Sequence, residues 1–293
     1  MNRVRKQIHY SRAEKEQLTG YHIGVGVLDS GIFPHEDLKD QIRAFRDFTN
    51  KYQLPYDETG HGTHVCGILA GNGRVLHGKY KGMAPCCDLY VGKILDKKGE
   101  GSLKTLLRGL EWLLSISESC NIRIINISVS SIASARQEEQ RKLYELFQYA
   151  YENNILIVTA AGNFGPGDNT ISRLGDTPYV ICVGCHDGDL ENGGLRCQDC
   201  SGRGPGENVW KKPDVVAPGT QIISCQAAYG KYVARSGTSM ATPIVSGLLA
   251  LACEKYPYLT AMQLKRKLII SATDLGESYL MQGAGMVDVE KML

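Results

Sequence analysis

Short apolar runs alternate with longer, helix-compatible stretches along most of this chain. This alternation is typical of parallel β-strands that are joined by crossover helices. The predicted strands are residues 25–29, 89–95, 122–129, 155–160, 179–184 and 220–225, and the predicted helices are residues 61–71, 103–114, 137–153, 240–253, 260–272 and 287–292. We therefore expect an α/β fold of three layers, in which helices flank a mainly parallel β-sheet and functional side chains follow the carboxyl ends of strands.

One serine stands where a segment of small residues meets an apolar segment. Residues 236–239 are small, and residues 240–253 have the composition of a buried helix. The hydroxyl of Ser239 is therefore expected at a helix start, where backbone N–H groups lack partners and can stabilise an oxyanion. A serine among glycines is also a common turn or cap residue, so its interpretation depends on the rest of the chain.

Two earlier segments supply the partners that a nucleophilic serine needs. Asp29 ends the apolar run 25–29 and is followed by a turn, which places its carboxylate at the carboxyl end of a predicted strand. His61 opens a helix-compatible run of small residues. Aspartate, then histidine, then serine is one of the chain orders in which a catalytic triad occurs.

Four motifs now identify a family. The chain contains D-S-G at 29–31, H-G-T-H-V-x-G at 61–67, A-A-G-N at 160–163 and G-T-S-M-A-T-P at 237–243. In these motifs, and in their order and separation, it resembles the subtilisin-like serine peptidases (the subtilase family) of the intracellular type. The resemblance extends from about residue 22 to the C-terminus and implies the three-layer subtilisin-like fold.

The resemblance also implies a role for each motif residue. Ser239 corresponds to the nucleophile, His61 to the general base and Asp29 to the residue that orients His61. Asn163 corresponds to the side-chain amide that stabilises the oxyanion beside the backbone N–H of Ser239. For Asn163 the alternative interpretation is a turn residue in a left-handed conformation.

In the same family the substrate lies as an added strand between two edge segments, and strand addition gives affinity without strict sequence requirements. The matching residues are Gly99, Glu100 and Gly101 on one side, Ser128, Val129 and Ser130 on the other, and Ala160, Ala161 and Gly162 at the wall of the P1 pocket. The chain departs from the family at Ser130, which is usually glycine, and at Leu174, where a proline often stands. Glu100 corresponds to the border of the P4 pocket, and its alternative interpretation is a solvated charge at a strand edge.

Two groups of residues raise the question of zinc. His61 and His64 are three residues apart, but no acidic residue follows His61 as a metalloprotease motif requires, so we expect His64 to be a packed neighbour of the site. Cys182, Cys185, Cys197 and Cys200 have the spacing of a four-thiolate site. Since side chains three apart on a strand point to opposite faces, packed free thiols are favoured over a metal site.

Calcium enters only through the resemblance. Asp37 matches a calcium ligand of the family, but the loop 71–80 has few side-chain oxygens apart from Asn72, so a weak or missing calcium site is expected. No cofactor is expected to be required for catalysis.

Length and charge favour a single peptidase domain, residues 1–293, in which residues 1–21 form a short N-terminal extension. No linker composition divides the 293 residues, and the net charge of +2 favours neither a nucleic-acid partner nor a membrane. Residues 1–7 are basic but no apolar signal segment follows them, and the ten cysteines suit reduced thiols, so we expect a cytoplasmic location. The sequence gives no prediction for the oligomeric state.

The principal hypothesis is a serine endopeptidase that acts on peptides or unfolded proteins, for intracellular protein turnover or peptide maturation. The alternative is a catalytically silent subtilase fold that serves as a binding or regulatory module. A zinc-dependent hydrolase that uses His61 and His64 is a third possibility.

Overall fold

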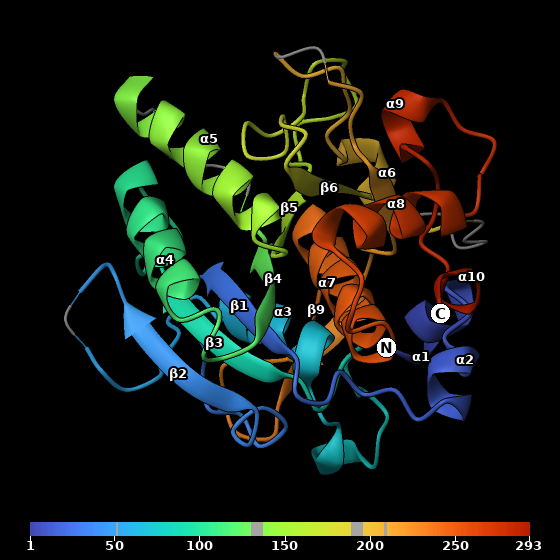
Figure 1. Ribbon diagram of the computed structural model, residues 1–293. Coiled ribbons are helices and arrows are strands. Elements are labelled where there is room, and N and C mark those ends of the chain that lie inside the picture. The colour runs from blue at the N-terminus through green and yellow to red at the C-terminus, as the bar shows by residue number, and fades with distance from the viewer. Residues whose placement is uncertain (51, 130–136, 189–195, 208–209) are drawn as a thin grey trace.

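A seven-stranded sheet forms the centre of the molecule, whose computed structural model describes residues 1–50, 52–129, 137–188, 196–207 and 210–293 (Figure 1). Its strands lie in the order β2-β3-β1-β4-β5-β6-β7, and the neighbouring pairs are parallel. The bounds are β1 Gly24–Asp29, β2 Ile42–Asp47, β3 Asp88–Lys93, β4 Ile122–Ile127, β5 Leu156–Ala160, β6 Val180–Cys185 and β7 Val215–Ala217. The predicted α/β fold with a mainly parallel sheet is confirmed.

The strand predicted at residues 220–225 lies outside this sheet. It forms β8 Ile222–Cys225, which pairs antiparallel with β9 Tyr232–Arg235 in a separate two-stranded sheet. The sequence prediction also omits β2, β7 and β9. β2 is an edge strand without a fully buried residue, and β7 has only three residues, so neither forms the long apolar run that indicates a buried strand.

Helices cover both faces of the sheet (Figure 1). α4 Leu103–Ser115 and α5 Gln137–Glu152 pack on one face, and α3 His61–Ala70 and α7 Thr238–Lys255 pack on the other. β1 alternates between these layers, because Val25 and Val27 belong to the core under α3 and α7 whereas Leu28 belongs to the core under α4 and α5. The remaining helical segments are α1 Asn2–Gln7, α2 Ser11–Lys15, η1 Arg74–Leu76, α6 Cys197–Cys200, α8 Ala261–Ser271, α9 Tyr279–Gln282 and α10 Val289–Met292.

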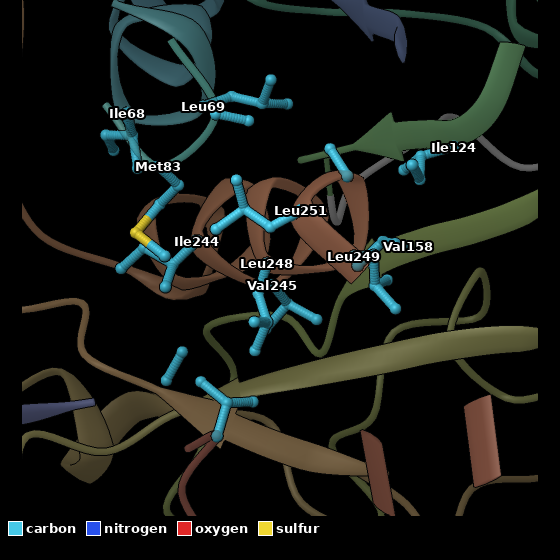
Figure 2. Packing of buried hydrophobic residues seen from close by; sticks show 14 of the residues in the cluster. Ile68, Leu69, Met83, Ile124, Val158, Ile244, Val245, Leu248, Leu249 and Leu251 are labelled. Carbon is cyan, nitrogen blue, oxygen red and sulfur yellow. The ribbon is translucent and has the colours of Figure 1, made fainter. Parts of the chain in front are cut away.

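α7 is the most deeply buried of these helices. Its residues from Thr238 to Cys253 are all buried, which agrees with a segment that is apolar on every side. Figure 2 shows its leucine, isoleucine and valine side chains between α3 and the sheet, close to Met83. A Cβ atom at Gly247 would lie 2.3 Å from the Cβ of Met83, so the absence of a side chain there permits the close packing.

Residues 1–21 contain two short helices that the sequence analysis does not predict. Arg5 Nη2 donates to the carbonyl of Gly82 at 2.7 Å, and the hydroxyl of Tyr10 donates to the carbonyl of Met83. α2 also packs against α10. The N-terminal segment therefore lies folded against the helical layer that contains α7.

Several carboxyl ends of strands and two helix starts meet at one edge of the sheet. β1 ends at Asp29 and β5 ends at Ala160, whereas α3 begins at His61 and α7 begins at Thr238. α3 and α7 pack directly against each other. Of the helices in the described ranges, none combines the length and the apolar composition needed to cross a bilayer.

Candidate active site

Asp29 and His61 form a close pair at this edge of the sheet. Oδ1 of Asp29 lies 2.7 Å from Nδ1 of His61 and also accepts a hydrogen bond from the backbone N–H of Ser30 at 2.7 Å. Asp29 is fully buried, and the side chain of His61 is 23% exposed. An imidazole held through Nδ1 keeps Nε2 available as the nitrogen that takes or gives a proton.

The environment shifts the pKa of His61 in opposing directions. Burial acts to lower it, but the charge of Asp29 and its hydrogen bond together outweigh burial, so that the pKa of His61 is raised above its ordinary value. Two further charges have smaller effects on this pKa, since Arg235 lowers it and Asp57 raises it. The site therefore stabilises the imidazolium that a general base becomes.

Asp57 is a functional neighbour that the sequence analysis misses. Oδ1 accepts from the hydroxyl of Ser30 at 2.8 Å and from the N–H of Gly60 at 2.9 Å, and Oδ2 accepts from the N–H of Thr63 at 2.8 Å. This carboxylate therefore pairs N–H groups at the start of α3 and links that start to the end of β1. A carboxylate shortly before a helix start is a capping signal that could have identified Asp57 from the sequence.

Glycines allow α3 to approach β1 closely. A Cβ atom at Gly62 would lie 2.1 Å from the carbonyl oxygen of Gly31, and Gly31 itself has a φ of +117°. The hydroxyl of Ser30 accepts from the N–H of Gly62 at 2.9 Å. The glycines of the two motifs thus bring the end of β1 and the start of α3 together, and with them Asp29 and His61.

Ser239 is the second residue of α7 and is buried. Its hydroxyl donates to the carbonyl oxygen of Ser128 at 2.6 Å. Within the described ranges the structure gives no hydrogen bond between Ser239 and His61. In active sites without a bound ligand, such contacts are often long and tighten only in the complex. The backbone N–H of Ser239 lies in the first turn of α7, where N–H groups have no partner within the helix.

Asn163 is held next to the start of α7. Its Oδ1 accepts from the backbone N–H of Thr238 at 3.1 Å and from the hydroxyl of Thr238 at 3.1 Å. Because the oxygen is used in this way, the amide nitrogen of Asn163 is turned away from Thr238, and the residue is exposed. Gly237 has a φ of +141°, and a Cβ atom there would lie 3.5 Å from both Nδ2 and Oδ1 of Asn163. The arrangement leaves the N–H donors of Asn163 near the start of α7.

The substrate-binding residues that the resemblance implies lie on three segments. Gly99 and Glu100 form an exposed turn in which Asp96 N donates to Glu100 O at 2.9 Å, and only Gly101 forms a bridge, with Leu95. Ser128 and Val129 follow β4 and are buried, whereas Ser130 lies outside the described residues. Ala160 ends β5 and is followed by Ala161 and Gly162, whose carbonyls accept from Ser172 N and Gly202 N. Leu174 is buried.

His64 makes its hydrogen-bond contacts with the β8-β9 sheet. Its Nε2 is 3.0 Å from the carbonyl oxygen of Ile222 and 3.0 Å from that of Val233. Burial, as the largest effect, lowers the pKa of His64 to about 3, so the ring is neutral and packs between α3 and the β8-β9 sheet. This position gives no support to a metal ion shared by the two histidines.

The cysteines correct one prediction. Cys185, at the end of β6, and Cys197, at the start of α6, form a disulfide with a Cα–Cα distance of 5.8 Å. The expectation of free thiols at all four positions of the Cys182 to Cys200 group is therefore wrong for these two, because α6 packs against β6 and brings the two cysteines within bonding distance. Cys182 and Cys200 are free.

One group in the described ranges has its side chains close enough to hold a metal ion, namely His35, Asp37 and Cys225. The ring of His35 is already occupied, since Nδ1 accepts from Asp37 N at 3.1 Å and Nε2 lies 3.1 Å from the carbonyl oxygen of Lys231. A metal ion would have to displace these contacts, so the group is packed as a hydrogen-bonded cluster.

The same contacts test the fit of calcium at Asp37. Oδ1 of Asp37 accepts from Val75 N at 3.0 Å, and Oδ2 accepts from the hydroxyl of Tyr232 at 2.5 Å. Oδ1 of Asn72 accepts from Arg74 N at 3.0 Å. Calcium requires six to eight oxygen ligands, whereas these oxygens face N–H and O–H donors. The residues around Asp37 do not fit a calcium ion.

Comparisons with known proteins show what the chain as a whole is similar to. The model of the Subtilase family matches residues 20–287. Serine protease AprX of Bacillus subtilis (strain 168) is 36% identical, over 94% of this chain and 67% of that protein. Subtilisin DY of Bacillus licheniformis is 32% identical, over 95% of this chain and 94% of that protein. Among solved structures, S41 Psychrophilic Protease superposes with a TM-score of 0.81 at 28% identity, over 92% of each chain.

Proposed function

This chain belongs to the subtilase family of serine peptidases, and on that premise we propose that it hydrolyses peptide bonds with a triad of Asp29, His61 and Ser239. The observation that carries the proposal is the 2.7 Å contact between His61 Nδ1 and buried Asp29 Oδ1, at the edge of the sheet where α7 begins with Thr238 and Ser239. Both the family motifs and this geometry support it.

In the proposed reaction Ser239 Oγ attacks the scissile carbonyl carbon while His61 Nε2 removes its proton. Asp29 keeps the ring oriented through Nδ1 and stabilises the imidazolium, which accounts for the raised pKa of His61. His61 then protonates the leaving amine, and the acyl group remains on Ser239 as an ester. Water, activated by the same ring, hydrolyses that ester and restores the hydroxyl.

The oxyanion is proposed to accept two hydrogen bonds, one from the backbone N–H of Ser239 and one from Nδ2 of Asn163. Support comes from the orientation of Asn163, whose Oδ1 is fixed by Thr238. A donor that is held in place before the reaction loses little energy to reorganisation when the charge develops. Asn163 is thus a catalytic residue of the proposal and not only a turn residue.

The proposed substrate is a peptide or unfolded protein segment that lies along residues 99–101 and 128–130, with the P1 side chain beside residues 160–162. The chemistry needs only groups of the chain, so we propose that catalysis requires no cofactor. We also propose that no calcium binds at Asp37, which is satisfied instead by Tyr232 and Val75.

We further propose that residues 1–293 act as one peptidase domain with residues 1–21 as an extension, since α1 and α2 pack against the body of the fold. A cytoplasmic role in protein turnover or peptide maturation is supported by the eight free cysteines, although the Cys185–Cys197 disulfide weighs against it.

A catalytically silent binding module is the second candidate, and one observation favours it. The hydroxyl of Ser239 donates to Ser128 O, which holds it away from the role of nucleophile. The two candidates differ in a single measurable property, because a silent module binds peptides but forms no covalent adduct at Ser239.

A fluorophosphonate probe tests the proposal. The probe should label Ser239, as located by mass spectrometry, and Ser239→Ala should lose both labelling and peptide cleavage by at least about 10³-fold. Ser236→Ala is the matched control, since this exposed serine lies three residues earlier. The probe should label Ser239 of this variant as it labels the unmodified protein. An adduct elsewhere, or undiminished cleavage by Ser239→Ala, contradicts the triad.

A further inference from the structure

Among the described residues, the guanidinium of Arg235 has no carboxylate partner, and it lies against the segment that leads into the proposed general base. Arg235 ends β9 and stands four residues before Ser239. Its Nη2 donates to the carbonyl oxygen of Thr59 at 2.9 Å, two residues before His61. Its Nε is buried and has no hydrogen-bond partner among the described residues. The guanidinium thus spans from the segment that carries Ser239 to the segment that carries His61.

The acidic residues that precede His61 are engaged with other groups. Asp57 accepts from Ser30, Gly60 and Thr63. Glu58 lies 2.7 Å from Nζ of the buried Lys93. Within the described ranges, Arg235 forms no ion pair at 4.0 Å or less. Arg235 is partly buried and has an unpaired buried N–H. A carboxylate bound next to such a charged group is stabilised by a charge-assisted hydrogen bond.

The position of Arg235 defines which part of a substrate it can reach. On the proposed mechanism His61 protonates the leaving amine, so the residues after the scissile bond depart on the side of His61. The proposed oxyanion donors, the backbone N–H of Ser239 and Nδ2 of Asn163, lie on the side of the acyl group. Arg235 contacts Thr59 and lies close to Gly60, in the segment that leads directly into His61, and this proximity assigns it to the leaving-group side.

We propose that Arg235 is a specificity-determining residue of the leaving-group side, where it favours an acidic side chain at the first or second residue after the scissile bond. This inference rests on the proposed function and deepens it. The positive charge of Arg235 repels the imidazolium of His61 and so lowers the pKa of His61. An acidic substrate residue there would offset this repulsion.

Acyl-transfer experiments measure binding on the leaving-group side separately from formation of the acyl-enzyme. An ester substrate with a neutral acyl group forms the acyl-enzyme, and added amino-acid amides then compete with water for it. Aspartate amide is compared with asparagine amide, and glycyl-aspartate amide with glycyl-asparagine amide. The acidic nucleophile of at least one pair should be captured about two- to fivefold better, and the ratio should fall toward one at high salt, because the charge is partly exposed.

Variants assign the preference to the charge. Arg235→Gln should bring the ratio to one, Arg235→Glu should invert it, and Arg235→Lys should keep most of it. Arg141→Gln, which removes an exposed positive charge on α5, is the matched control and should leave the ratio unchanged. The salt dependence of the unmodified protein tests the inference even if a variant fails to fold.

The possible failures are distinguishable. If the ester forms no acyl-enzyme, the proposed function itself is overturned. If the acyl-enzyme forms but the acidic and neutral nucleophiles are captured equally, or if Arg235→Gln keeps the preference, the role of Arg235 is overturned and the proposed function stands.

Discussion

The proposed catalytic centre and the rim of the proposed substrate groove are built in opposite ways. In the centre, Asp29 and Asp57 are buried, and several backbone and side-chain donors hold them in place. On the rim, Glu100 is exposed and Arg235 is only partly buried, and neither forms an ion pair within the described ranges. The centre fixes positions, whereas the rim supplies charge that solvent screens. Changes in the centre should therefore alter rates by orders of magnitude, and changes on the rim by small factors.

The largest effect expected beyond the triad itself comes from Asn163. Asn163→Ala should lower kcat by about 10²–10³-fold with little change in KM, because the amide contributes mainly when the oxyanion forms. Steady-state kinetics on a peptide substrate measures both constants. Asn153→Ala, an exposed change at the end of α5, is the control. A loss below tenfold, or a change confined to KM, would place Asn163 outside the catalytic centre.

The pH dependence of the rate probes the electrostatics of the centre. His61 must be neutral to act as a base, so kcat/KM should fall about tenfold per pH unit on the acidic side of its pKa. Since that pKa is raised, the midpoint should lie above the ordinary value of about 6.5. A midpoint below 6.5 would mean that burial outweighs Asp29.

The same measurement links the centre to the rim. Arg235 lowers the pKa of His61, so Arg235→Gln should move the midpoint to higher pH, provided that Asp29 and Asp57 stay in place. An unchanged midpoint would show that solvent screens Arg235 fully from the ring.

The contribution of Asp37 to the stability of the fold extends the comparison to a buried carboxylate outside the catalytic centre. Tyr232→Phe should lower the free energy of unfolding by about 1–3 kcal/mol, because it leaves Asp37 Oδ2 without its donor. Tyr229→Phe, on an exposed ring of the same β8-β9 connection, is the control and should have little effect. Thermal unfolding with and without a chelator completes the test. A large gain in Tm on adding calcium to the unmodified protein would contradict the hydrogen-bonded arrangement at Asp37.

The sequence predicts the catalytic centre better than its surroundings, and the reason is physical. Asp29, His61, Asn163 and Ser239 each lie at the end of a strand or the start of a helix, with small residues beside them, and such signals are local. Arg235 is not predicted because its role depends on segments that meet only in the fold, as when Arg235 reaches Thr59. Asp57 has a local capping signal, but its link to Ser30 at the end of β1 again depends on the fold.

The errors in the fold have the same origin. Residues 220–225 have the apolar character of a buried strand, but their partner is β9, which has no buried residue to indicate it. The Cys185–Cys197 disulfide joins residues whose spacing equally suits a zinc site. Local patterns predict the element, whereas its partner is decided by the packing of distant segments.

The smallest effect is expected at Glu100, which is proposed to border the acyl side of the substrate groove. Its backbone is fixed by Asp96, which accepts from Glu100 N at 3.0 Å and donates its own N–H to Glu100 O at 2.9 Å. Since the turn is held by backbone contacts, Glu100→Gln should leave the geometry intact and change only the charge. A basic P4 residue should be preferred about two- to fivefold by the unmodified protein at low salt, and the preference should be lost in Glu100→Gln.

A peptide library with varied P4 residues, cleaved at low and moderate salt, measures this preference, and Glu118→Gln is a control remote from the groove. A P4 profile that is identical in both proteins would mean that Glu100 is a solvated charge at the edge of the turn. If instead the preference is present but insensitive to salt, it arises from a desolvated contact and not from the screened field that distinguishes the rim from the centre. Loss of the basic preference together with its salt dependence would therefore support both the P4 position of Glu100 and the contrast between the two regions.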